Sequence, residues 1–188
     1  MAQPKAPLLT ITPQWSQRCW DFLEYWKSLR GGALMPTSEA ILDTMPGRFV
    51  STAYVVELTE SASVVRFQGT DLVTQWGVNR TGQDIGGHRS SKLQAAILAI
   101  NRTIVERVCG YISQSSNTTS RGRDIDICII RLPVAVKAGR RPRVVACVDE
   151  SYLPGEREEA WKKYRVVGHA WCDIGAGVPD FPPNPITQ

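Results

Sequence analysis

The side chains best suited to acid–base, nucleophilic or metal chemistry are few in this sequence and are dispersed along it. Only two histidines occur, His88 and His169. A nucleophilic thiol would have to pair with one of them, and the five cysteines stand at positions 19, 109, 128, 147 and 172. Each cysteine has apolar neighbours, and burial among such neighbours raises a thiol pKa and keeps the thiol unreactive. The pattern therefore predicts reduced, buried thiols rather than a catalytic pair.

Two acidic pairs are the other candidates for acid–base work. Asp124 and Asp126 stand two apart in a strand pattern, an arrangement that is common on the solvated face of a sheet. Asp149 and Glu150 are adjacent, so in a strand their side chains point in opposite directions. We expect no catalytic residue, no metal site and no enzymatic activity, with a small enzyme of unrecognised type as an alternative.

Charge is mildly positive and gathers in two segments. Lys and Arg total 22 against 18 Asp and Glu, a net charge of +4, which does not by itself indicate nucleic-acid binding. Six basic residues fall in two predicted loops that would lie at one end of a sheet and could meet a phosphate backbone. We expect solubilising charge there instead. The residues are Arg121, Arg123, Lys137, Arg140, Arg141 and Arg143.

Composition indicates one globular domain with terminal extensions. The 188 residues are 43% hydrophobic and 21% charged, which suits a chain with a real core. No apolar run approaches the roughly 20 residues needed to cross a bilayer, and the first 15 residues lack a secretory signal. We therefore expect a cytoplasmic protein with no membrane partner.

The clearest single element is an amphipathic helix over residues 13–30. Thr12 is a suitable N-cap, Pro13 suits the first helical position, and Gly31-Gly32 ends the helix. Apolar residues form one stripe along it, and Trp20 and Tyr25 add a second apolar surface. Two copies packing about a two-fold axis would cover both surfaces, so we expect a homodimer, although the aromatic residues could instead cover the sheet of their own chain. The predicted interface comprises Trp15, Trp20, Phe22, Tyr25 and Trp26.

Strand and helix patterns alternate through the middle of the chain. Residues 53–58 and 63–69 are rich in β-branched and aromatic side chains and predict an antiparallel hairpin. Gly69 ends the second strand, because glycine reaches backbone angles closed to other residues, and Gly77 ends the short helix that follows in the left-handed conformation. Further elements are expected over 37–45 and 93–109 as helices, and over 111–118, 124–136 and 143–148 as strands.

Two short motifs resemble a known family. One is R-x-x-G-T at 66–70 with Gly77 and T-G at 81–82, and the other is Y-W-x-x-L-R-G-G at 25–32 followed by M-P at 35–36. Together they resemble the PAS-like family of small α-proteobacterial sensory proteins, over about residues 20–84 and more weakly to 153.

The resemblance implies an α+β fold. Its core would be a PAS-like five-stranded antiparallel sheet with helices on one face and a cavity between them, preceded by the N-terminal helix. A C-terminal helix is expected over 156–167, supported by Glu158/Lys162 and Glu159/Lys163 at i,i+4 spacing. The organisation predicted is a flexible lead-in over 1–11, a PAS-like domain over 12–153, and a helix with a proline-rich, disordered or extended tail over 154–188.

A sensory pocket is the function that the resemblance implies. The residues expected to surround the ligand are Val65, Phe67, Leu72, Trp76, Leu93, Ile97, Ile100 and Ile129. No cofactor is assigned: His88 precedes the long helix that supplies an axial ligand in haem-binding relatives, and the cysteine motif of flavin photosensors is absent. We expect a module that binds a small molecule or a signalling protein and responds through the packing of its N-terminal helix. The alternative is a dimerisation or scaffold module without a ligand.

Overall fold

A six-stranded sheet organises the chain. Residues 15–119, 124–150 and 161–183 are those that the computed structural model describes. In chain order the elements are α1 (Gln17–Leu29), α2 (Ser38–Thr44), α3 (Gly47–Val50), β1 (Ala53–Leu58), β2 (Ser63–Gln68), α4 (Thr70–Trp76), α5 (Ser91–Arg107), β3 (Gly110–Thr119), β4 (Asp124–Val134), β5 (Arg143–Glu150) and β6 (Trp161–Cys172). The hairpin, the long helix and three later strands confirm the expected order of elements, and α3 was not predicted.

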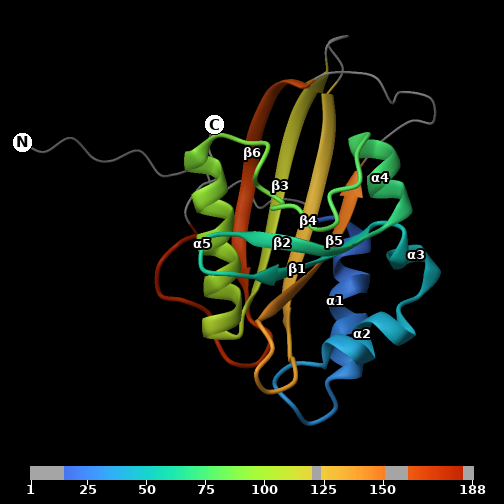
Figure 1. Ribbon diagram of the computed structural model, residues 1–188, viewed down its shortest axis with the longest axis vertical. Helices are drawn as coiled ribbons and strands as arrows, with labels where there is room; N and C mark the ends of the chain where they lie inside the picture. The colour runs from blue at the N-terminus through green and yellow to red at the C-terminus, as the bar shows by residue number, and fades with distance from the viewer. Residues whose placement is uncertain (1–14, 120–123, 151–160, 184–188) are drawn as a thin grey trace, which may run out of the picture.

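The strands lie in the order β2-β1-β5-β4-β3-β6, and each neighbouring pair is antiparallel. Figure 1 shows that the sheet curls strongly, because β1 and β2 run almost across the direction of the long strands β3, β4 and β6. The antiparallel α+β architecture was predicted correctly. The count of five strands was wrong, since β6 adds a sixth beyond β3.

Strand β6 replaces most of the helix predicted at the C-terminal end. It pairs with β3 from Gly110 opposite Cys172 to Thr119 opposite Trp161, so its backbone groups are bonded to another strand. The helix expected over 156–167 was therefore wrong for residues 161–167. Residues 156–160, like the lead-in 1–11 and the expected cap at Thr12 and Pro13, lie outside the described residues.

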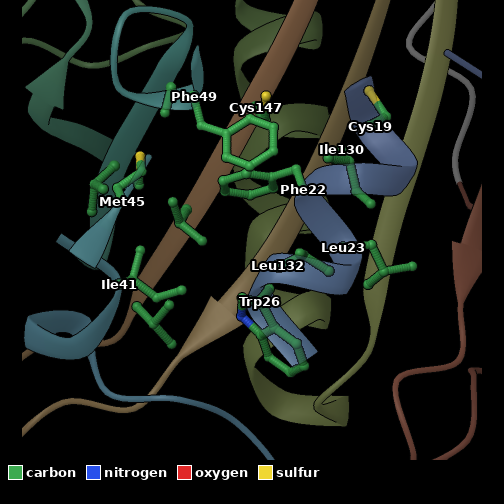
Figure 2. Packing of buried hydrophobic residues seen from close by; sticks show 14 of the residues in the cluster. Cys19, Phe22, Leu23, Trp26, Ile41, Met45, Phe49, Ile130, Leu132 and Cys147 are labelled. Carbon is green, nitrogen blue, oxygen red and sulfur yellow. The ribbon is translucent and has the colours of Figure 1, made fainter. Parts of the chain in front are cut away.

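Helices cover both faces of the sheet, so the prediction of helices on one face was wrong. On one face α1 packs over β4, β5 and β1, with α2 and α3 beside it. Figure 2 shows Trp26 of α1 beside Leu132 of β4, and the ring of Phe22 against that of Phe49, 5.3 Å between centroids. Trp26 is completely buried and donates its indole N–H to the carbonyl oxygen of Pro133 at 2.9 Å. The hydrogen bond fixes the rotation of α1 on the sheet.

The opposite face carries α4 and α5. Ser90 caps α5 by accepting from the amide of Leu93 at 3.4 Å. The helix ends where Val108 takes the left-handed conformation, with φ of 51°. The apolar core on this face comprises Tyr54, Val56, Leu58, Val65, Leu72, Ile85, Leu93, Ile100, Ile104, Tyr111, Ile125, Ile127, Val144, Ala146 and Val148.

A bulge in β2 changes which side chains share a face. Val55 of β1 lies opposite Phe67, and the next residue of β1, Val56, lies opposite Val65. Arg66 is therefore the extra residue, and its guanidinium pairs with Glu57 at 2.8 Å. Val65 packs with the α5 face and Phe67 with the α1 face. Simple alternation, which would put both residues on one face, fails at this point.

Gly69 is needed for space rather than for unusual backbone angles. It is the N-cap of α4, and its φ of −66° is available to any residue. A Cβ built on it would lie 2.3 Å from the carbonyl oxygens of Val50 and Ser51. The close approach lets the Ser51 oxygen accept from the amides of Asp71 and Leu72 at 2.9 and 3.3 Å, which satisfies the first turn of α4. Gly77 ends the helix with φ of 66°, as predicted.

Residues 173–183 pack against the domain as irregular structure. Ile174 is buried in the α1-side core, and Arg30 donates to its carbonyl oxygen. The indole N–H of Trp171 donates to the carbonyl oxygen of Phe181 at 2.9 Å. These contacts hold the described part of the proline-rich segment that was predicted to be disordered or extended.

Candidate functional site

A cavity of about 290 Å³ lies between the sheet and the helices α4 and α5. Its size is close to the lower end of the range for small-molecule sites in proteins, roughly 300–1,000 Å³. The sheet forms its floor, α4 and α5 form its walls, and the segment 77–90 borders it. The lining residues are Tyr54, Trp76, Arg80, Ile85, His88, Arg89, Leu93, Ile97, Ser115, Ile127, Ile129, Arg131 and Glu150.

A larger surface groove of about 630 Å³ lies near the turn between β1 and β2 and the C-terminal half of α5. It is open to solvent, and its lining includes several exposed charged side chains. The groove lacks the combination of apolar walls and buried polar groups that marks a ligand site. The smaller cavity is therefore the better candidate.

Half of the predicted ligand-binding residues line the cavity, namely Trp76, Leu93, Ile97 and Ile129. The others do not. Val65, Leu72 and Ile100 are buried among apolar neighbours in the core of the same face. Phe67 packs on the opposite face of the sheet, because the bulge at Arg66 reverses the alternation. Contact of the four lining residues with a ligand stays a prediction.

Glu150, at the end of β5, is the acidic residue of the lining. Its Oε1 accepts from the indole N–H of Trp76 at 3.2 Å. Its Oε2 is buried and has no hydrogen-bond partner among the described residues. Burial raises the Glu150 pKa to about 7, and the charge of Asp149 adds to this effect against the hydrogen bond from Trp76. Asp149 itself points to the other face and pairs with Arg18 of α1 at 3.3 Å, so the two carboxylates diverge as predicted.

Arg131 is a buried cation in the middle of β4. Only 6% of it is exposed, and its Nε donates to the Tyr54 hydroxyl oxygen at 3.0 Å. The guanidinium also lies 5.5 Å from the centre of the Tyr111 ring, within cation–π distance. Along the sheet, Arg131 pairs with Ala146, four residues before Glu150. The backbone positions of the two charged residues are thus separated by about 13 Å along the strands.

Three further basic side chains come from the segment that precedes α5. Arg80, His88 and Arg89 border the cavity from one side. Burial lowers the pKa of Arg80, and the positive charge of Arg89 lowers it further. The His88 pKa falls to about 4 through burial and then through Arg89 and Arg80. The imidazole is therefore neutral at physiological pH, although the residue is an exposed loop histidine.

The segment 77–90, which carries these side chains, is hydrogen-bonded to the outer edge of β2. Ile85 donates its amide to the Ser63 carbonyl oxygen at 2.9 Å, and Gly82 donates to that of Val65 at 2.8 Å. The Asp84 carboxylate accepts from the amide of Ser63 at 3.2 Å. Gln68 accepts from the amide of Arg80 at 2.7 Å. These bonds fix the position of the cavity border relative to the sheet.

The predicted dimer interface is mostly internal. Phe22 and Trp26 are 0% exposed, so neither can contact a second chain while α1 lies on its own sheet, and their assignment was wrong. Trp15 is partly buried against the same core, and the Tyr25 hydroxyl donates to a carbonyl oxygen of α2 at 2.9 Å. Trp20 is 40% exposed, which leaves it accessible on the outer side of α1.

The cysteines are all free thiols, and Cys172 is the one that is not fully buried. Burial raises the pKa of Cys109 to about 11 and those of Cys147 and Cys172 to about 12, as expected. The interaction between the neighbouring thiols, together with burial, raises the pKa of Cys19, and the same interaction lowers the pKa of Cys128 to about 7. Cys128 is only 6% exposed, so its thiol is buried as predicted.

Of the two basic segments, the one that contains Arg121 and Arg123 lies outside the described residues. Arg143 pairs with Glu57 at 3.1 Å, which removes it from any free basic surface.

The described ranges contain neither a metal-binding cluster nor a membrane-spanning helix. Within residues 15–119, 124–150 and 161–183, no three His, Cys, Asp or Glu side chains are grouped so that they could hold a metal ion. In the same ranges, no helix is long and apolar enough to span a membrane.

Sequence reasoning did not identify the polar residues of the cavity. Arg131 was detectable as a charge inside the apolar run Ile129 to Leu132.

Comparison with known proteins adds one finding: a family model described as a PAS domain matches residues 16–149, more than two thirds of the chain. No curated protein matches the chain.

Proposed function

Because the chain belongs to the PAS domain family, we propose that it is a sensory module that binds a small molecule between its sheet and helices α4 and α5. One observation carries the proposal, namely the bordered cavity of about 290 Å³ with apolar walls and convergent polar groups. The motif resemblance extends the proposal to a relationship with small sensory proteins of α-proteobacteria. The role is binding rather than catalysis, and the five cysteines suit the reducing cytoplasm.

The output of this module would be the packing of α1. Two adjacent residues of β5 connect the cavity to that helix, since Glu150 contacts Trp76 of α4 and Asp149 contacts Arg18 of α1. A ligand that moves Glu150 would shift the backbone that also carries Asp149. In this way a ligand bound in the cavity would weaken or strengthen the contact that holds the start of α1 on the opposite face of the sheet.

A partner surface belongs to the same proposal. Trp20 lies on the outer side of α1 and is 40% exposed, which makes it the accessible aromatic residue of that helix. A second copy of the chain or a signalling protein would cover it. If the cavity proves empty, this surface still allows the alternative of a dimerisation or scaffold module.

Mass spectrometry and a cavity-filling variant test the proposal. We expect the natively purified protein to carry a small compound, or to be stabilised by members of a metabolite library in thermal-shift assays. Ile97→Trp fills the cavity and should abolish both effects. Ala99→Trp adds the same side chain at an exposed position of the same helix and should keep them.

The result that contradicts the proposal is equally specific. If native mass spectra show the polypeptide alone, and if no library member raises the melting temperature of the wild type, the cavity is not a ligand site. Equal responses from the two tryptophan variants would also contradict it, because the ligand would then bind elsewhere.

A further inference from the structure

Glu150, Ile127 and Ser115 form one row across the sheet beneath the cavity. Glu150 of β5 lies directly opposite Ile127 of β4, and Ile127 lies directly opposite Ser115 of β3. All three residues line the cavity, so their side chains share the face of the sheet that carries α4 and α5. Neighbouring strands are about 4.8 Å apart, which places the backbones of Glu150 and Ser115 about 10 Å apart with Ile127 between them.

The carboxyl group of Glu150 has an unused hydrogen-bonding site. Trp76 donates to its Oε1 at 3.2 Å, whereas the buried Oε2 has no partner among the described residues. The position of Trp76 is fixed further by the Tyr54 ring, whose centroid lies 6.0 Å from that of the indole. A buried polar atom without a partner costs free energy, and a ligand group that bonds to it removes that cost.

The hydroxyl group of Ser115 is the second polar group of the row. Ser115 is only 5% exposed, so its hydroxyl lies in the interior beside the cavity. A serine hydroxyl can donate one hydrogen bond and accept two. A polar ligand group that lies above Ile127 therefore has a carboxyl on one side and a hydroxyl on the other.

A hydroxyl is the ligand group that fits this pair best. Burial raises the pKa of Glu150 to about 7, so the protonated and the ionised carboxyl both occur near neutral pH. A ligand hydroxyl can donate to the ionised form and accept from the protonated form, and in both cases its oxygen can also accept from Ser115.

Charged groups fit the same place less well. A ligand carboxylate would put a second acidic group beside Glu150, and two neighbouring carboxylates oppose each other's ionisation. An ammonium ion would lose its hydration on entering a cavity whose walls are largely carbon.

The remainder of the lining determines the body of the ligand. Ile85, Leu93, Ile97 and Ile129 present only carbon to the cavity. A body with several polar groups, such as a sugar, would leave hydrogen-bonding groups unsatisfied against these side chains. An apolar body would instead bury its surface there.

We propose that the cavity binds a small uncharged alcohol or phenol, whose hydroxyl group lies between Glu150 and Ser115 and whose apolar body lies toward Ile97 and Ile129. The inference rests on the proposed function, because it assigns a ligand class to the same cavity. The hydroxyl group rather than the size of the molecule decides which compounds are accepted.

Isomers that differ in the hydroxyl group test the inference. Benzyl alcohol and anisole contain the same atoms, as do 1-hexanol and methyl pentyl ether, but the ethers have no O–H group. Dissociation constants for the four compounds are measured by ligand-observed NMR and calorimetry at pH 7. We expect each alcohol to bind at least tenfold more tightly than its ether isomer, a difference of about 1.4 kcal/mol. Benzoate, benzylammonium, hexanoate and hexylammonium should bind more weakly than both alcohols.

Variants of the two polar residues locate the hydroxyl group. Glu150→Met keeps an unbranched side chain and removes the carboxyl, so the alcohols should bind no more tightly than the ethers. Glu150→Gln keeps a hydrogen-bonding group and should retain part of the preference. Ser115→Ala is a milder change and should weaken the alcohols about fivefold while the affinities of the ethers stay the same.

Matched controls separate the site from the rest of the fold. The side chain of Ser116, the next residue of β3, points to the other face of the sheet, so Ser116→Ala should keep the full preference for alcohols. Glu24→Met makes the same change as Glu150→Met at an exposed position of α1 and should alter nothing. Ile97→Trp fills the cavity and should abolish binding of all probes. Circular dichroism establishes that each variant is folded.

Each other outcome counts against the inference. Equal affinities for alcohol and ether, or a preference for a charged probe, would overturn it and leave the cavity as a binding site. A preference for alcohols that survives both Glu150→Met and Ser115→Ala would show that the hydroxyl group lies elsewhere. If no probe binds, the inference fails, and native mass spectrometry of the wild type still decides the proposed function separately.

Discussion

Trp76 and Glu150 join α4 to the end of β5 through one hydrogen bond, in which the indole N–H donates to Oε1 at 3.2 Å. The bond satisfies one oxygen of a buried carboxyl and leaves the other without a partner in the described part of the chain. A carboxyl in this situation is easier to bury protonated than ionised. The free energy of folding is therefore linked to the protonation of a group that also lines the cavity.

The first prediction concerns this linkage. Glu150 has a pKa of about 7 in the folded protein against 4.5 for an ordinary glutamate, so between these values the folded state holds a proton that the unfolded state releases. Its contribution to the free energy of unfolding is full at low pH and declines as the pH rises through this window. We expect Glu150→Gln to be more stable than the wild type at pH 8, by up to roughly 3 kcal/mol.

Urea denaturation of both proteins across this pH window measures the difference. Glu24→Gln, at an exposed position of α1, is the control and should follow the wild type at every pH. A stability difference between Glu150→Gln and the wild type that does not change with pH would contradict the prediction.

The second prediction concerns Gly69. A Cβ at this position meets two backbone carbonyl oxygens at 2.3 Å, and backbone atoms cannot move aside as a flexible side chain can. We expect Gly69→Ala to lower the free energy of unfolding by about 2–3 kcal/mol, and Gly69→Val by at least as much. Gly32→Ala, where the added atom meets nothing within 4 Å, is the control and should change stability little. If chemical denaturation showed Gly32→Ala to be less stable than Gly69→Ala, the result would contradict this account.

The third prediction compares two tryptophans of the same helix. Trp26→Phe removes the donor to the Pro133 carbonyl oxygen and leaves a void in the α1-side core, at a cost of about 2–4 kcal/mol. Trp20→Phe changes an exposed side chain and should stay within about 0.5 kcal/mol of the wild type. Thermal and urea unfolding of both variants decides the matter, and equal losses would mean that α1 is not held as described.

The fourth prediction concerns self-association. If Trp20 contacts a second copy, Trp20→Glu should shift the protein from dimer to monomer in light scattering while its circular dichroism stays native. Leu42→Glu places the same charge at an exposed apolar position of α2 and is the control. A wild type that is monomeric at tens of micromolar removes this part of the proposal.

The spacing of apolar residues predicted those helices and strands in which buried positions recur at the regular helical or strand period. Strands β1 to β5 and helix α5 were expected within a few residues of their observed bounds, because their apolar spacing agrees with their final environment. Strand β6 was missed because charges at i,i+4 spacing favour a helix locally, whereas pairing with β3 decides the conformation. The bulge at Arg66 was missed because an inserted residue changes the facing of Phe67 without changing the composition of the strand.

The candidate site was predictable only in its apolar part. Trp76, Leu93, Ile97 and Ile129 follow from the periods of α4, α5 and β4. The role of Glu150 depends on the curl of the sheet and on the place of α4, neither of which a single sequence specifies. The sequence also does not show that α1 packs on the opposite face of the sheet. For this reason its buried aromatic stripe was predicted to be a dimer interface.

The pairing of β6 with β3 has a consequence for biosynthesis. Residues 120–160 lie between the two strands in the chain, so β3 must wait for its outer neighbour until the ribosome has made residues 161–172. In the meantime a ten-residue strand presents unpaired amides and carbonyls, which can template association with other nascent chains. The interval before residues 161–172 have been made is therefore when this domain depends most on chaperones, and slow decoding of the codons for residues 151–172 would prolong that interval.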